Sequence, residues 1–514
     1  MNYGELFRVT LPETALDLAA LIVLLVDLAF LRKAALKSRA AVAAVLGVVG
    51  CIAAMWAVGI QTGSGFSVDG LLVLANGGVS AVAQMGVLIL TVVTLLLLID
   101  SNFTKHPGEF VAVMLMASSG GLVISAARDL LVIFIGLELL SIGLYILTAF
   151  GKASAKSAEA ALKYYLFGGM SAALLLFGFS YLYGLSGSTN LYRVVLTAYR
   201  TDTISAWPLW ALALVLVAAG LGFKVAAVPF HLWAPDTYEG APAPAAAFIA
   251  SVSKVASFAL LITISAVALN PFAGLHLSGG HVTARMFITT TTAPTPIPFG
   301  FFAPWSRILT VLAALSMVVG NLAALAQTSV RRLLAYSAIA HAGYVLLALA
   351  YPSYSARSAQ AVLYYVLTYG LTTIGAFGVI GVVERASGSD KLDAFLGLHK
   401  RNPVLAGVLL ILFLSLAGIP PLVGFWAKFN LFAAVLAVGG GVWPFALVAL
   451  AVAMSAVSLY YYLQVLKRAY VMPAVDETPI QVHPVTMLVL VAIAAVVVLS
   501  GCLPSVLQGW IASF

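Results

Sequence analysis

Long apolar runs recur along the whole chain, and short stretches between them hold most of its charged residues. Runs of roughly twenty residues are long enough to cross a bilayer as helices, whereas barrel strands would read as short alternating segments. We therefore predict an all-α polytopic membrane protein with about fourteen transmembrane helices. The predicted spans are residues 12–31, 40–60, 77–99, 109–127, 129–150, 160–185, 207–230, 242–268, 305–327, 333–352, 358–384, 402–432, 441–466 and 483–503.

At the start of the third span, residues 69–76 could form a surface segment instead of continuing the helix. Lysines and arginines give the orientation, because loops on the cytoplasmic side of a membrane carry an excess of them. With the N-terminus outside, about twice as many fall in inner loops as in outer ones. This bias predicts that both termini lie on the outer, periplasmic side of the cell inner (plasma) membrane.

Two spans share an unusual composition. The seventh reads GLGFKVAAVPF and the twelfth AGIPPLVGFWAKF, so that each combines glycine, proline, aromatic residues and one buried lysine. Interrupted helices at matching positions of two inverted halves are typical of transporters. We predict two inverted five-helix repeats, residues 109–268 and 305–467. Three N-terminal helices (1–108), an extramembrane loop (269–304) and a C-terminal helix (468–514) complete the predicted organisation.

The amino-acid composition excludes several classes of function. The chain is 62% hydrophobic and 9% charged, against about 25% charged residues in soluble domains. Its net charge of +8 does not predict nucleic-acid binding, because the cations are spread over loops in runs no longer than a pair. The cysteines, Cys51 and Cys502, form no CxxC motif, so we expect neither a metal site nor a cofactor site in this chain. A glycine-rich phosphate loop and a nucleophile elbow are also missing, so we expect no bond chemistry here.

Four ionisable residues lie deep inside predicted spans: Glu138, in FIGLELLSIGLY, and Lys224, Lys254 and Lys428. A charge at the bilayer centre costs roughly 2.5–3.5 kcal/mol on insertion scales, so these groups must be paired, hydrated or partly neutral. A lysine beside a carboxylate can hold a proton and release it when the carboxylate withdraws. The pattern favours proton transport, although a static buried ion pair that only fixes packing is the alternative.

Weaker candidates are His341, in AIAHAGY, His231, and Lys163 in the sixth span. A histidine can relay protons near neutral pH, but a core histidine or a helix cap would look the same. Lys163 could extend to the membrane surface. Asp27, in the first span, could contact a partner or form a lipid-facing polar site.

The motif FKVAAVPFHLWAPDTYEGAPAP resembles the signature of the antiporter-like proton-channel subunits of respiratory complex I, which are similar to subunits of multisubunit cation/proton antiporters. LELLS, YEGAP, RRLLAYSAIAHAGY and GIPPLVGFWAKF look most like the subunit N group of that family. The resemblance implies a proton-translocating subunit of an NADH–quinone oxidoreductase. It places NADH, FMN, iron–sulfur clusters and quinone in partner subunits, and makes the neighbouring membrane subunits and the lipid bilayer its partners.

The resemblance also implies roles for individual residues. Glu138 would pair with Lys224, Lys254 would be the central lysine of a broken eighth helix, and Lys428 would serve the exit half. His231 and His341 would lie on a central hydrophilic axis, with Lys163 near it. Two other functions remain open: a subunit of a sodium/proton antiporter, and a structural membrane subunit with a degenerate channel.

Overall fold

The computed structural model of the 514-residue chain describes residues 3–68, 71–101, 103–200, 206–269, 302–352, 357–439, 441–474 and 477–514. This part is helical except for one antiparallel hairpin, in which Ser64 lies opposite Asn76. The predicted loop 269–304 falls almost wholly outside the described residues. The elements are α1 (Tyr3–Val9), α2 (Leu11–Ala29), α3 (Leu36–Gln61), β1 (Ser64–Val68), β2 (Leu71–Asn76), α4 (Val79–Leu98), α5 (Pro107–Ala126), α6 (Leu130–Thr148), α7 (Ala155–Ser186), α8 (Leu191–Arg200), α9 (Trp207–Lys224), α10 (Trp233–Gly240), α11 (Ala243–Leu269), α12 (Phe302–Leu325), α13 (Val330–Ala350), α14 (Arg357–Ser387), η4 (Leu392–Phe395), α15 (Leu398–Arg401), α16 (Pro403–Ala417), α17 (Val423–Ala437), α18 (Val442–Tyr470), α19 (Pro484–Cys502) and α20 (Pro504–Ala512).

The helices confirm the predicted polytopic membrane fold. Among the described residues, 12 helices are long and apolar enough to cross a membrane, or up to 13 if α1 and α2, which meet at a 72° bend, form one span. The shorter apolar helices α16 and α17 together occupy the predicted span 402–432. The third predicted span begins as α4, two residues after its predicted start, and β2 occupies the residues before it.

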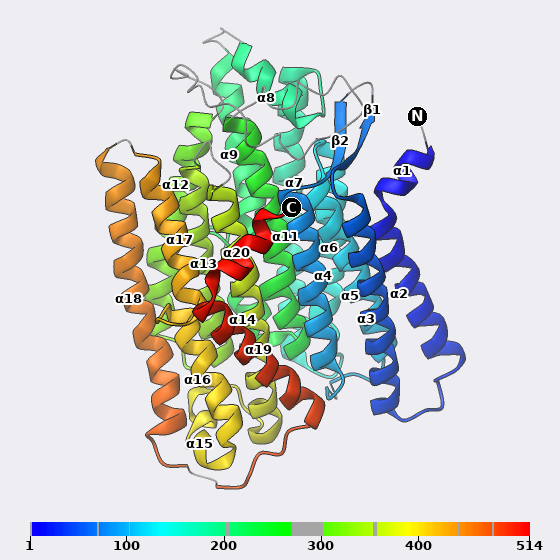
Figure 1. The fold of residues 1–514 in the computed structure, drawn as a ribbon, viewed down its shortest axis with the longest axis vertical. Helices are drawn as coiled ribbons and strands as arrows, with labels where there is room; N and C mark the ends of the chain where they lie inside the picture. Colours follow the sequence, from blue (N-terminus) through cyan, green and yellow to red (C-terminus); the bar gives the residue numbers. More distant parts are fainter. Residues whose placement is uncertain are drawn as a thin grey trace.

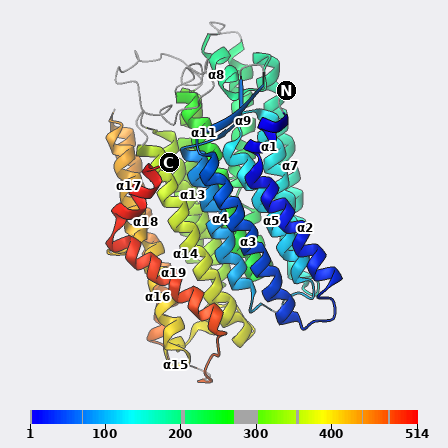
Figure 2. The same ribbon diagram turned by 45° about the vertical axis from the view of Figure 1, so that its right-hand side comes forward.

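The ends of the bundle differ. Figure 1 places α15, the α2–α3 loop and the α18–α19 loop at one end, called here the α15 end. The hairpin, α8 and the N-terminus lie at the other, the α8 end. Figures 1 and 2 show α11, α13 and α14 inside the bundle, between the N-terminal helices and α18. Accordingly, 94% of the apolar window of α13 is buried against 22% of that of α18.

Two spans are interrupted. The seventh ends as α9 at Lys224 and resumes as α10 at Trp233, and the twelfth breaks between α16 and α17. Proline lacks the amide hydrogen that a helix interior needs, and Pro229 lies in the first gap while Pro420 and Pro421 lie in the second. The eighth span is not broken, so the expectation that Lys254 lies in an interrupted helix was wrong. The helix α11 is 27 residues long and, beyond Pro244 in its first turn, contains neither proline nor glycine.

Asp27 is neither lipid-facing nor free for a partner. Its side chain is 2% exposed and accepts hydrogen bonds from Arg39 Nε at 2.8 Å and Nη2 at 2.7 Å. Arg39 also donates to the carbonyl oxygen of Lys105 at 3.2 Å. A Cβ atom on Gly108 would lie 2.5 Å from Asp27, so glycine lets α5 approach this pair. The pair therefore joins α2, α3 and the start of α5 at the α15 end.

We predict that Arg39→Gln destabilises the protein by about 3–5 kcal/mol, because it leaves the buried carboxylate of Asp27 without its cation. The thermal unfolding midpoint of the purified protein in detergent measures this effect. Lys400→Gln is the matched control, since Lys400 and its partner Glu477 are 55% and 69% exposed and an exposed pair contributes little. Equal midpoints for the two variants would contradict the structural role given to Asp27.

Candidate functional site

Lys224 is the last residue of α9, and its side chain turns toward α6. The ammonium group donates to Ser141 Oγ at 2.6 Å and lies 3.4 Å from Glu138 Oε1. Glu138 and Ser141 are one turn apart on α6, so both reach the same lysine. The lysine side chain is 7% exposed and that of Glu138 is 24% exposed. The structure thus brings together the pair that the resemblance implied.

The break after Lys224 is held by side chains. Trp233 Nε1 donates to the carbonyl oxygen of Phe223 at 3.0 Å, and Ser316 on α12 accepts from the amide of Val228 at 2.9 Å. The Trp233 ring also stacks on Tyr164 of α7 at 4.3 Å. An interrupted helix leaves backbone groups without partners, and burying them unbonded would be costly. These contacts satisfy two of them.

Lys254 lies in the middle of α11 and is buried. Its Nζ donates to the carbonyl oxygen of Ala338 on α13 at 2.7 Å and stands 5.8 Å from the ring centre of Tyr369 on α14. A carbonyl oxygen and the face of an aromatic ring both attract a cation. The lysine is therefore held by neutral groups, and no carboxylate pairs with it among the described residues.

His341 connects Lys254 to the second half of the chain. Its ring lies 4.8 Å from that of Tyr369, between ring centres, and its Nδ1 is 2.7 Å from the hydroxyl of Tyr365. Its Nε2 is buried and has no hydrogen-bond partner in the described part of the chain. His341, Tyr369 and Lys428 line one small cavity. The imidazole can thus exchange a proton on either side.

Lys428, on α17, faces the break in the twelfth span. Its Nζ donates to the carbonyl oxygen of Ala417, the last residue of α16, and to Ser455 Oγ on α18, both at 2.8 Å. It also lies 5.6 Å from the ring centre of Tyr344 on α13. Gly418 has φ of 89°, and a Cβ atom there would lie 2.9 Å from the lysine side chain. Only glycine both makes this turn and leaves room for the lysine.

His231 and Lys163 lie elsewhere, around α10. His231 is in the break, and its Nδ1 is buried without a partner among the described residues. Lys163 is 2.8 Å from Asp236 and 2.7 Å from Glu159. Asp236 also accepts a hydrogen bond from Arg332 Nη1 at 2.6 Å. These groups form an ionic network around α10.

Several contributing residues escape sequence reasoning. Ser141 had a signal, since it follows Glu138 by one turn in LELLS. Tyr369, Tyr344 and Ser455 had none, because nothing in the chain says which helix faces which lysine. The described residues contain no group of three or more histidine, cysteine or acidic side chains that could hold a metal ion. The arrangement can hold and pass protons along Lys254, His341 and Lys428, beside a separate Glu138–Lys224 pair.

Known proteins place the chain in a family. The family described as NADH:quinone oxidoreductase/Mrp antiporter, TM, has a model that matches residues 127–293 and 282–455. Subunit N 2 of the NADH-quinone oxidoreductase of Acidobacterium capsulatum is 46% identical over 520 residues, which cover 99% of each chain. A chain of respiratory complex I from Thermus thermophilus, solved with bound aureothin, is 32% identical, with a TM-score of 0.74 over 97% of this chain and 98% of that one.

A chain of the Mrp complex from Dietzia sp. has a TM-score of 0.77 over 98% of this chain and 51% of its own length. At 21% identity, this likeness shows a shared fold only. The subunit N relative matches over nearly its whole length, as the motifs around Glu138 and Lys224 predicted. The chain therefore belongs to the NADH:quinone oxidoreductase/Mrp antiporter family of membrane proteins, within which it groups with subunit N.

Proposed function

We propose that this chain is a proton-translocating membrane subunit of an NADH–quinone oxidoreductase. The observation that carries the proposal is the buried series Lys254, Tyr369, His341 and Lys428, which crosses from the first predicted half to the second. Lys254, His341 and Lys428 can each hold or pass a proton, and a purely structural core would not need three such groups there. The subunit N relative supports the same conclusion through its name.

The proton path has two parts in this proposal. Glu138 and Lys224 form a switchable pair, in which the carboxylate favours the charged lysine and its withdrawal favours proton release. Lys254, His341 and Lys428 form the second part, which passes a proton toward the exit half. His231 and Lys163 have a supporting role around α10, where they respond to movement of the gap between α9 and α10. Quinone reduction in partner subunits, which would hold NADH, FMN, iron–sulfur clusters and quinone, supplies the driving force.

We infer that the α15 end faces the cytoplasm. This end holds Arg32, Lys33 and Lys400, and cytoplasmic loops are enriched in such residues. Both termini would then lie on the periplasmic side of the inner membrane. The neighbouring membrane subunits of the complex and the bilayer would contact the exposed apolar helices. One of these is α18, of whose apolar window only 22% is buried.

We predict that Lys224→Ala, Glu138→Ala and Lys428→Ala each lower NADH-driven quinone reduction and proton pumping several-fold, because each removes a proton-holding group. The complex should still assemble, as judged by co-purification of its subunits. Lys400→Gln, an exposed lysine at the α15 end, should leave both rates unchanged. If the Lys224, Glu138 and Lys428 variants all pump at the normal rate, the chain is a structural subunit with a degenerate channel.

Lys428→Arg separates proton transfer from simple charge. Arginine keeps the positive charge but stays protonated at any physiological pH, so it cannot release a proton. We predict that Lys428→Arg pumps as poorly as Lys428→Ala in proteoliposomes. Pumping restored by arginine would mean that Lys428 acts only as a fixed charge. The same proteoliposomes test the antiporter alternative, which requires proton transport to depend on sodium.

A further inference from the structure

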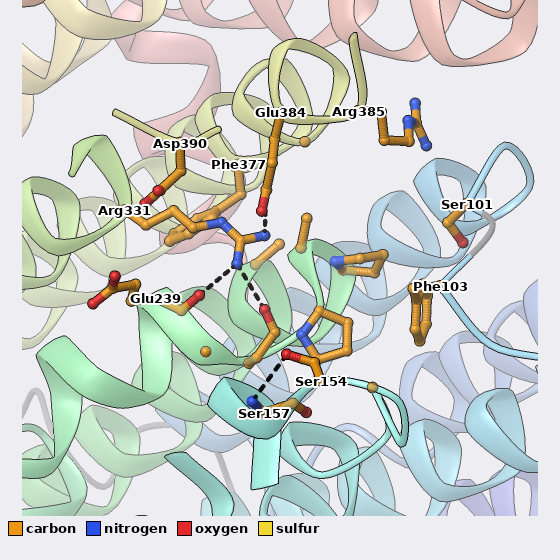
Figure 3. A pocket seen from close by; sticks show the side chains of 18 of the residues that line it. Ser101, Phe103, Ser154, Ser157, Glu239, Arg331, Phe377, Glu384, Arg385 and Asp390 are labelled. Atoms are coloured by element: carbon orange, nitrogen blue, oxygen red, sulfur yellow. Dashed lines mark hydrogen bonds and ion pairs between the residues drawn. The ribbon is translucent and has the colours of Figure 1, made fainter. Parts of the chain in front are cut away.

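A cavity of about 600 Å³ lies at the α15 end, next to the junction between α10 and α11. Figure 3 shows its charged lining, with Arg331 and Glu384 on one side and the loop that carries Ser101 and Phe103 on the other. Helices of both predicted halves form its walls, since Glu239 belongs to α10 and Glu384 to α14. None of the relay lysines lines this cavity.

Arg331, at the start of α13, ties these walls together. Its Nη1 donates to the carbonyl oxygens of Glu239 and Ala241, both at 2.8 Å, and its Nη2 lies 3.0 Å from Glu384 Oε2. Figure 3 shows these three interactions converging on the guanidinium group. The side chain is 4% exposed, and its Nε is buried without a partner among the described residues. A buried cation that still has a free donor is a place where water would bind.

Two helices run from the cavity to Lys254. On α11, Ala247 lines the cavity and Lys254 follows two turns later. On α13, Arg331 lines the cavity and Ala338, the acceptor for Lys254, also follows two turns later. Two turns of helix rise about 10 Å, and residues at this spacing share one face. The cavity and the central lysine are therefore about 10 Å apart along one seam.

The seam contains hydroxyl groups. Ser251 stands on α11 between Ala247 and Lys254 and donates to the carbonyl oxygen of Ala247 at 2.6 Å. The hydroxyl of Tyr238 is buried and has no partner in the described part of the chain, and its ring contacts that of Phe377, which lines the cavity. Such groups can bond a short file of water molecules. The guanidinium group of Arg331 lies where this seam between α11 and α13 meets the cavity.

We propose that Arg331 is a positioning residue that controls water entry from this cavity to Lys254. The inference rests on the proposed function and adds that Lys254 is the first group of its series to receive a proton. When the contact between Arg331 and Glu384 opens, water reaches Ser251, and a hydronium ion gives its proton to the neutral amine of Lys254, leaving water and an ammonium group. Lys254 thus draws its proton directly from the α15 end, independently of the Glu138–Lys224 pair.

Cysteine labelling of the assembled complex tests the proposal. In a Cys51→Ala, Cys502→Ser background, Ala247→Cys and Ser251→Cys are exposed to a charged, membrane-impermeant methanethiosulfonate reagent in inside-out vesicles. Ala247→Cys should react in every background. Ser251→Cys should react slowly, and adding Glu384→Ala should speed its reaction at least about tenfold, because Arg331 loses a charged hydrogen-bond partner.

Arg385→Ala is the matched control, since Arg385 lines the same cavity and pairs with Asp100 at 2.8 Å, away from α10 and α11. It should leave the labelling rate of Ser251→Cys unchanged. Equal rates with and without Glu384→Ala, or an equal effect of Arg385→Ala, would overturn the proposal. Glu384→Gln replaces Glu384→Ala if the alanine variant does not assemble. Labelling is measured without turnover, so its outcome does not depend on proton pumping. An unchanged labelling rate would refute only the role of Arg331, whereas normal pumping in the Lys224, Glu138 and Lys428 variants would refute the proposed function.

Discussion

Every charge buried in this bundle needs a partner, because hydrocarbon offers none. The two interrupted spans help to supply partners. The last four carbonyl groups of a helix have no partner within it, and the same end of the helix carries a partial negative charge. Lys428 donates to the carbonyl oxygen of Ala417, the last residue of α16. Lys224 is itself the last residue of α9. At each break, a lysine therefore stands where a helix ends inside the protein.

The lysine sites are not equivalent. Lys224 has a carboxylate partner in Glu138, whereas Lys254 and Lys428 are held by carbonyl oxygens, a hydroxyl group and aromatic faces among the described residues. A carboxylate stabilises the ammonium form more than neutral dipoles do. Lys224 therefore depends on a charged side chain, while the other two depend on neutral groups of packed helices. The two kinds of site suit a switch followed by a relay.

The sequence predicted the spans because each is a long apolar run, and it predicted both interruptions because proline lies in each gap. It failed where a property depends on the facing helix. Asp27 looked lipid-facing from its own helix, yet Arg39 on α3 reaches it with two hydrogen bonds. The break expected at Lys254 came from the family resemblance, and no proline or glycine supports it.

The tyrosines around the lysines were also beyond reach of the sequence. Tyr369 lies on α14, whose apolar window is 89% buried, and a helix surrounded by protein has no polar face to indicate direction. Tyr344 contacts Lys428 from α13, 84 residues earlier in the chain. Only the packing of the helices shows that these rings and lysines meet. The candidate lysines could thus be named from the sequence, but not the order in which they connect.

The short helix α10 joins the switch to the relay. Eight residues are too few for a helix to be stable alone, so its surroundings must hold it in place. Arg332 forms ion pairs with Asp236 and Glu239. Arg331 donates hydrogen bonds to two carbonyl oxygens at the C-terminal end of α10. Both arginines belong to α13, which also carries His341. In the proposed path, a movement that begins at the Glu138–Lys224 pair and shifts α10 would pull on the helix that holds the histidine and so connect the two parts mechanically.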